Sequence, residues 1–131
     1  MKKDPRVYLA HILERADRIE QYLAEGENAF LADRKTQDAV IRNFEVIGEA
    51  AKRVTAEYRA LHPGIPWQLM AGFRDILIHA YQGVDLRRVW AIATNDLPLV
   101  KKAISAILPP LDQLEREIAE GTSDDDEGKR P

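Results

Sequence analysis

The chain has 131 residues, of which 45% are hydrophobic and 31% charged, and its formal net charge at pH 7 is −3. This length and composition predict one globular domain and exclude disordered and fibrous proteins, and the small negative charge argues against a strongly basic nucleic-acid-binding domain. Cysteine is absent, which excludes disulfide scaffolds, thiolate zinc sites and cysteine nucleophiles.

The first half of the chain predicts two long helices with a short one between them. The first is expected to begin at Asp4-Pro5, an N-cap followed by a first-turn proline, and to end at Gly26. A short turn of helix is expected over 28–33 and a long helix over 34–58. The residues predicted to face the core recur at helical spacing: Leu9, Ile12, Ala16, Ile19 and Leu23, then Ile41, Phe44, Ile47, Ala51 and Val54.

The second long helix is thin in its middle, where Gly48, Ala50 and Ala51 carry little or no side chain. A neighbouring helix is therefore expected to approach it closely there. The segment 62–66 (HPGIP) then interrupts the helical pattern, because two prolines and a glycine do not continue a helix.

A third helix is predicted from near Trp67 to near Tyr81, where Gly83 stops it. Asp85 is expected to cap a fourth helix. The sequence NDLP at 95–98 predicts a break or kink with a new first turn, since proline disfavours helix at the residue before it. The residues predicted to face the core here are Trp67, Met70, Phe73, Leu77, Leu86, Val89, Trp90, Ala93, Leu99, Ile104, Ile107 and Leu108.

The chain changes character after Pro109-Pro110. Residues 111–120 predict a last, more polar helix that is only partly docked, and the acidic residues 121–131 predict a disordered tail. No stretch alternates with a period of two, so the predicted fold class is all-α. We expect a bundle of four to five helices within residues 1–120, followed by the tail at 121–131.

Localisation and charge add two expectations. No apolar run is long enough to span a membrane, and the first six residues lack the apolar stretch of a signal peptide, so we expect a cytoplasmic protein without a membrane partner. Residues 34–102 hold eleven Lys or Arg against seven Asp or Glu, an excess that would attract a polyanion. Solvated helix faces of mixed charge explain the same excess without any ligand.

Most residue patterns that would support catalysis are missing. His11, His62 and His79 are far apart in the sequence, and none belongs to an H-E-x-x-H motif. Glu45 and Glu49 lie four residues apart on one predicted helix, but no Glu-x-x-His motif exists to complete a di-metal site. There is no P-loop, no G-x-G-x-x-G and no nucleophile elbow. We therefore expect neither a metal nor another cofactor.

The segment 74–81 (RDILIHAY) places polar functional groups in an otherwise apolar helix. An arginine binds phosphate through its guanidinium fork, and a histidine exchanges a proton near neutral pH. Arg74 and His79 together would suit metal-free cleavage of a phosphodiester. The alternative is structural: Arg74 pairs with an acid such as Glu49, and His79 only ends the helix.

The spacing of the two residues restricts how they meet. Positions 74 and 79 differ by roughly 140° around an ideal helix. Convergence of Arg74 and His79 therefore needs a bent helix end, the long reach of arginine, or a second copy of the helix from another subunit. Phe73, Ile76 and Ile78 also spread apolar surface around this helix, which is typical of an interface.

Three segments of the chain resemble the HepT toxins of the HEPN superfamily, the partners of MNT-type minimal nucleotidyltransferases in toxin–antitoxin pairs. The likeness extends over roughly residues 4–108. The segments that carry it are 42–52 (RNFEVIGEAAK), the I-P-W at 65–67 with 72–81 (GFRDILIHAY), and Val84-Asp85 through Val89-Trp90 with Asp96-Leu97-Pro98.

The resemblance implies a homodimeric HEPN-type helical bundle with two R-x-x-x-x-H motifs facing each other at the dimer interface. It implies a metal-independent ribonuclease with Arg74 and His79 as catalytic residues. The polar residue after the arginine, often Asn in the family, is Asp75 here, in a supporting role that orients Arg74. Tyr81 corresponds to the tyrosine that the partner nucleotidyltransferase adenylylates.

Two interpretations from different classes remain at this point. The first is an RNA-cleaving toxin that a cognate nucleotidyltransferase neutralises. The second is a non-catalytic HEPN helical scaffold that only binds a nucleotidyltransferase. Intact Arg74, His79 and Tyr81 favour the enzyme, whereas the modest charge and Asp75 favour the scaffold.

Overall fold

The computed structural model describes residues 4–80, 85–110 and 112–120, and of residues 75–80 the backbone alone. Within these ranges every regular element is helical, which confirms the predicted all-α class. None of the described helices is long and apolar enough to cross a membrane. In chain order the elements are α1 (Pro5–Tyr22), α2 (Glu27–Ala32), α3 (Arg34–Arg53), α4 (Ala56–Leu61), α5 (Trp67–Ala80), α6 (Leu86–Ala91), the π-helical turn η1 (Ile92–Asp96) and α7 (Leu97–Ser105).

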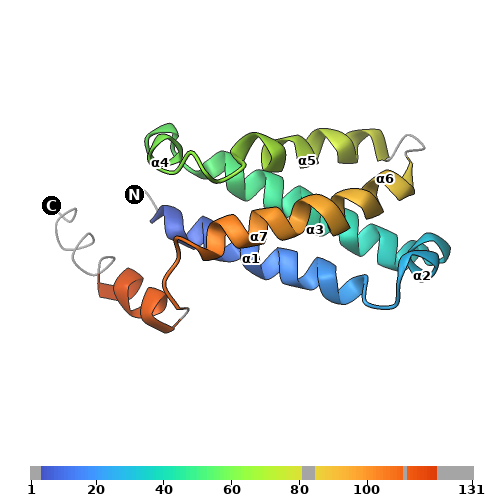
Figure 1. Ribbon diagram of the computed structural model, residues 1–131, viewed down its shortest axis with the longest axis horizontal. Helices are drawn as coiled ribbons and strands as arrows, with labels where there is room; N and C mark the ends of the chain where they lie inside the picture. Colours follow the sequence, from blue (N-terminus) through green and yellow to red (C-terminus); the bar gives the residue numbers. More distant parts are fainter. Residues whose placement is uncertain (1–3, 81–84, 111, 121–131) are drawn as a thin grey trace, which may run out of the picture.

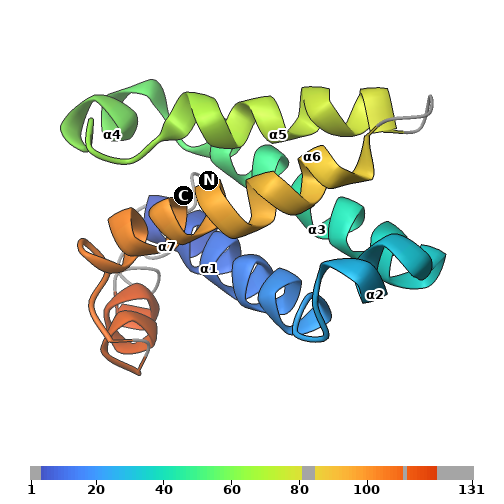
Figure 2. The same ribbon diagram turned by 45° about the vertical axis from the view of Figure 1, so that its right-hand side comes forward.

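Four rods run along the molecule in alternating directions: α1, α3, α5 and the continuous rod α6–η1–α7 (Figure 1). The central rod is α3, because it packs on both α1 and α5. The last rod lies on α1 through α7, and the short α2 contacts α3 and α6. Figure 2 shows α1 and α5 at opposite edges of the bundle.

The prediction of four to five helices was too low. The described chain holds seven α-helices before residue 106, and 112–120 add another helical stretch. The difference comes from the short helices α2 and α4, which connect the rods, and from the division of the last rod at η1.

Side-chain caps determine where several helices begin. Asp4 and Asp85 cap α1 and α6 as predicted, with a carboxylate oxygen accepting a hydrogen bond from a backbone N–H of the first turn. Asp33 caps α3 in the same way. Between α1 and α2 the chain turns at Gly26, whose φ of 100° suits glycine because it has no side chain to clash.

The single helix predicted over 34–58 is wrong, because α3 ends at Arg53. Val54 is extended, with φ −71° and ψ 133°. The hydroxyl of Thr55 then accepts a hydrogen bond from the N–H of Tyr58 at 3.2 Å and starts α4. Threonine is a good N-cap because its hydroxyl accepts a hydrogen bond from a free N–H of the first turn, so a new helix begins here.

The break or kink predicted at 95–98 is present as a π-helical turn. In η1 the N–H of Leu97 donates to the carbonyl of Ile92, five residues back, and Pro98 follows in the first turn of α7. Proline lacks an N–H, and in a regular α-helix its ring would clash with the carbonyl four residues before it. The wider turn accommodates the proline without ending the rod.

One prediction about the core is wrong. Leu99 was expected to face inward but is 59% exposed, whereas Leu97 is fully buried. Leu97 follows the buried Ala93 by four residues and precedes the buried Val100 by three, so the spacing of the core selects Leu97 and not Leu99.

The remaining core agrees largely with the predicted apolar spacing. All the core-facing residues predicted on α1 and α3 are buried, and so are Met70, Phe73, Val89, Ala93 and Ile104. Trp67 and Trp90, predicted as core residues, are half-buried and pack on the edge of the core. The indole N–H of Trp67 donates to the carbonyl of His62 at 2.9 Å, which closes the 62–66 turn.

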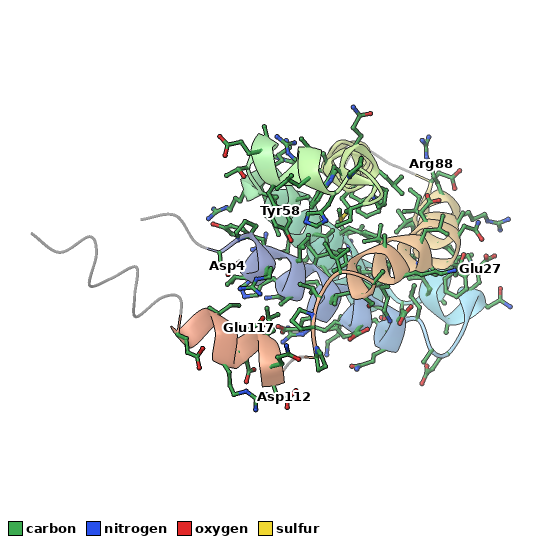
Figure 3. All side chains as sticks on the ribbon, turned by 60° about the vertical axis from the view of Figure 1, so that its left-hand side comes forward. Asp4, Glu27, Tyr58, Arg88, Asp112 and Glu117 are labelled. Atoms are coloured by element: carbon green, nitrogen blue, oxygen red, sulfur yellow. The ribbon has the colours of Figure 1, made fainter. Side chains whose placement is uncertain are left out.

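Residues 112–120 dock partly on α1, as predicted for the last helix. Leu114 is 2% exposed, while much of the rest of this helix is exposed. Arg6 on α1 bonds to both Asp4 and Glu117, at 2.7 and 2.8 Å, and Figure 3 labels these two acids on the facing segments. The hydrogen bonds from Arg6 hold the pKa of Asp4 below its usual value. The tail predicted at 121–131 lies outside the described residues.

The backbones of α3 and α5 meet at Gly48, which confirms the close approach predicted there. A Cβ atom at this position would lie 3.3 Å from the carbonyl oxygen of Met70 and 3.4 Å from the Cβ of Arg74. One turn away, the rings of Phe44 and Phe73 pack edge to face with centroids 5.0 Å apart. The contact therefore combines a glycine with a buried aromatic pair.

We predict that Gly48→Val destabilises the protein by about 1–3 kcal/mol, because its branched side chain would push against the backbone of α5. Gly72 on α5 is the matched control, since a Cβ atom there would meet nothing within 4 Å. Gly72→Ala is expected to be neutral or to stabilise by up to about 1 kcal/mol through helix propensity. Urea unfolding of both variants measures the difference. Equal stability of Gly48→Val and the wild type would contradict the close contact.

Candidate active site

Arg74 lies on the side of α5 that meets α3, and it pairs there with Glu49. Its Nη1 atom is 2.7 Å from Oε1 of Glu49, and the two side chains are 45% and 43% exposed. Both are accessible to solvent, so a ligand can reach the guanidinium. The ion pair predicted in the structural alternative is therefore present, and it leaves Arg74 open to a second role.

The two glutamates of α3 have different partners. Glu45 lies 3.4 Å from Arg42 on its own helix, whereas Glu49 reaches across to α5. Within the described residues, no group of three or more His, Asp or Glu side chains is arranged to hold a metal ion. The four-residue spacing of the glutamates in the sequence thus corresponds to two ion pairs.

The other predicted site residues are only partly described. Asp75 and His79 belong to α5, but their side chains lie outside the described residues, and so does the whole of Tyr81. The backbone of α5 continues as an α-helix through Ala80. The helix therefore does not end between Arg74 and His79.

The other two histidines lie away from this pair in the fold. His11 is exposed on α1. His62 follows α4, and its ring packs on Tyr58 with centroids 4.6 Å apart. His11 is thus solvent-facing, and His62 has a structural contact with Tyr58.

A groove of about 900 Å³ lies at a different place from Arg74. It is formed between α1 and the C-terminal segment, and its lining is mostly apolar, with Val7, Leu13, Leu108 and Leu114 among the residues. Neither Arg74 nor Glu49 belongs to it. The candidate site is the α3–α5 surface, where Arg74 pairs with Glu49.

The sequence predicted Glu49 only as an acid that pairs with Arg74 in the structural alternative. The sequence signal was available in the I-G-E-A segment, which puts Glu49 directly after the glycine that touches α5. A residue next to the point of closest approach is able to reach the neighbouring helix. The sequence did not show which helix packs against Gly48.

An antiparallel helical bundle with an R-x-x-x-x-H motif on its third long helix defines the HEPN class of helical domains. The chain belongs to the HepT-like ribonuclease family within this class, because the model of that family, described as "Ribonuclease HepT-like", matches residues 12–107. The match includes α3, α5 and the whole segment 74–81.

Several relatives support this membership. The chain is 47% identical over 102 residues to the "Probable ribonuclease HepT" of Thermococcus cleftensis, covering 77% of this chain and 93% of that protein. It is 44% identical over 114 residues to the "Gamma-glutamylcyclotransferase and putative RNase" of Methanocaldococcus jannaschii, covering 86% of this chain. The chain spans about half of the length of that second relative, 51%. No solved structure matches the chain.

Proposed function

We propose that this protein is a metal-independent endoribonuclease that uses Arg74 and His79. Membership of a ribonuclease family carries the proposal, since both residues lie inside the matched range 12–107. The accessible guanidinium of Arg74 supports it. No step of the reaction below requires a metal.

The chemistry follows from the functional groups. His79 removes the proton of the ribose 2′-hydroxyl that attacks the phosphorus, or protonates the 5′-oxygen that leaves it, since histidine is the usual general acid or base. Arg74 stabilises the charge that develops on the phosphorus-centred transition state. RNA is cleaved and DNA is not, because the attacking 2′-hydroxyl is missing from DNA.

We expect RNA cleavage to depend on both residues and to persist in EDTA. Arg74→Ala should slow cleavage by about 10²–10³-fold, as for the loss of one oxyanion-stabilising donor, and His79→Ala should do at least as much. The measurement is cleavage of total RNA by purified protein, together with growth of cells that express each variant. Gly72→Ala serves as a control outside the motif. Cleavage that EDTA abolishes, or that survives His79→Ala, would favour the non-catalytic scaffold instead.

We further propose that the active form is a homodimer with a composite site. Arg74 and His79 lie on one helix at positions roughly 140° apart, so the two positions belong to different faces of a single α5. A second α5 facing the first would bring the arginine of one subunit near the histidine of the other. It would also supply two histidines, one as acid and one as base.

Light scattering at micromolar concentration is expected to give the mass of a dimer. The exposed side of an apolar helix at the edge of the bundle is a suitable interface. A monomer that still cleaves RNA would remove the composite site, while leaving the long reach of Arg74 as the way to bring the two groups together.

Tyr81 is the proposed point of control by a partner, an MNT-type nucleotidyltransferase. An adenylyl group on its hydroxyl would bring a phosphate near Arg74, seven residues earlier and close to the same face of a regular helix. That phosphate would occupy the guanidinium and repel incoming RNA. The adenosine would fill space that the substrate needs.

Co-expression with the cognate nucleotidyltransferase is expected to add the mass of an adenylyl group to the peptide that contains Tyr81 and to stop RNA cleavage. Tyr81→Phe should keep cleavage and escape the modification. Intact-mass spectrometry of both proteins, with Tyr58→Phe as a control, makes the comparison. Inhibition without any added mass would mean that the partner acts by binding alone.

A further inference from the structure

The base of the Arg74 side chain is fixed by the contact between α3 and α5. The missing side chain of Gly48 lets α3 come so close that a Cβ atom there would lie 3.4 Å from the Cβ of Arg74 and 3.5 Å from its backbone nitrogen. The preceding residue, Phe73, is 1% exposed and packs on Phe44. The start of the arginine side chain therefore has little freedom to move relative to α3.

The tip of the same side chain is held by Glu49, the residue after Gly48. The 2.7 Å contact between Nη1 of Arg74 and Oε1 of Glu49 is a charge-assisted hydrogen bond. Glu49 therefore binds the guanidinium from α3, the same helix that fixes the base of the Arg74 side chain. An arginine has many rotamers, and a partner that selects one reduces the freedom that must be lost when a phosphate binds.

The exposure of the pair argues that its main effect is not on stability. Both side chains are more than 40% exposed, and ion pairs with such exposure add little to the free energy of unfolding. A carboxylate beside a phosphate-binding arginine also weakens the attraction for RNA. These two facts together favour a role in orientation, because the pair brings little stability and some electrostatic cost.

We propose that Glu49 is a positioning residue for Arg74 in RNA cleavage, an inference that rests on the proposed function. Glu49 holds one edge of the guanidinium so that the remaining donors point to the scissile phosphate. Its loss should lower kcat, since the guanidinium is then misplaced in the transition state. It should leave KM unchanged or lower it, since a negative charge near the RNA is removed.

The test compares three variants of the full chain on a fluorescent single-stranded RNA of mixed sequence. Glu49→Ala is expected to lower kcat by about 10–100-fold without raising KM. Glu49→Gln keeps an acceptor oxygen at the same length and should recover most of that loss. Glu45→Ala is the matched control, because it removes the same charge one turn earlier from a residue that pairs with Arg42.

The outcomes separate the inference from the proposed function. If the wild type cleaves RNA and Glu49→Ala keeps its kcat, the positioning role is wrong while the ribonuclease proposal stands. A loss of kcat as large in Glu45→Ala would show a general charge effect and would also overturn the inference. If Glu49→Ala does not fold, Glu49→Gln tests the inference instead. This variant retains an acceptor oxygen for Arg74, so a loss of kcat as large as that of Arg74→Ala would contradict the positioning role.

A second readout does not require cleavage. The Nε–Hε signal of Arg74 in an NMR spectrum, assigned by its absence in Arg74→Lys, reports how ordered the guanidinium is. We expect an ordered signal in the wild type and in Glu45→Ala, and a mobile one in Glu49→Ala. Equal mobility of Arg74 in the wild type and in Glu49→Ala would overturn the inference, whether or not RNA is cut. The absence of RNA cleavage by the wild type would refute the proposed function separately.

Discussion

Two helix backbones meet where Gly48 of α3 faces Met70 and Arg74 of α5, and this contact sets the position of the candidate site. The absent side chain allows the approach, and the edge-to-face pair of Phe44 and Phe73 holds its register. Because α3 packs on both α1 and α5, it fixes where these two helices lie relative to each other. The packing of the core and the placement of Arg74 thus depend on the same few residues.

This arrangement reconciles two interpretations that the sequence set against each other. An arginine paired with a glutamate is often only structural, and an arginine in R-x-x-x-x-H is a candidate phosphate ligand. The Arg74–Glu49 pair is half exposed, so its guanidinium remains accessible while one of its nitrogens is bonded. An ion pair in a folded protein therefore does not by itself exclude a catalytic role for the arginine.

Local signals in the sequence were sufficient for most of the fold. Apolar spacing gave the core of α1 and α3, and the caps at Asp4 and Asp85 gave the starts of two helices. The errors have two sources. Thr55 begins a new helix directly after an apolar pattern that continues through Val54, and periodicity does not detect such a change. The sequence around Pro98 offers two leucines, of which Leu97, and not Leu99, continues the spacing of Ala93 and Val100.

The candidate site was less predictable, for a physical reason. The spacing of Arg74 and His79 showed that one helix does not point both groups at one place, but it did not give the helix that faces Arg74. That information lies in the tertiary contact between α3 and α5, where residues 25 positions apart in the chain, Glu49 and Arg74, come within hydrogen-bond distance. The family match adds the reaction class, whereas the roles of His79 and Tyr81 depend on side chains outside the described residues.

The π turn at Ile92–Asp96 has a consequence for how homologous chains align. A single widened turn amounts to a regular helix with one residue inserted, because the N–H of Leu97 donates to the carbonyl of Ile92, five residues back instead of four. Pro98 needs that widening, because a regular helix would place its ring against a carbonyl. The inserted residue and the proline are therefore expected to be gained or lost together, so that a homologue without the proline aligns with a gap of one position in this turn.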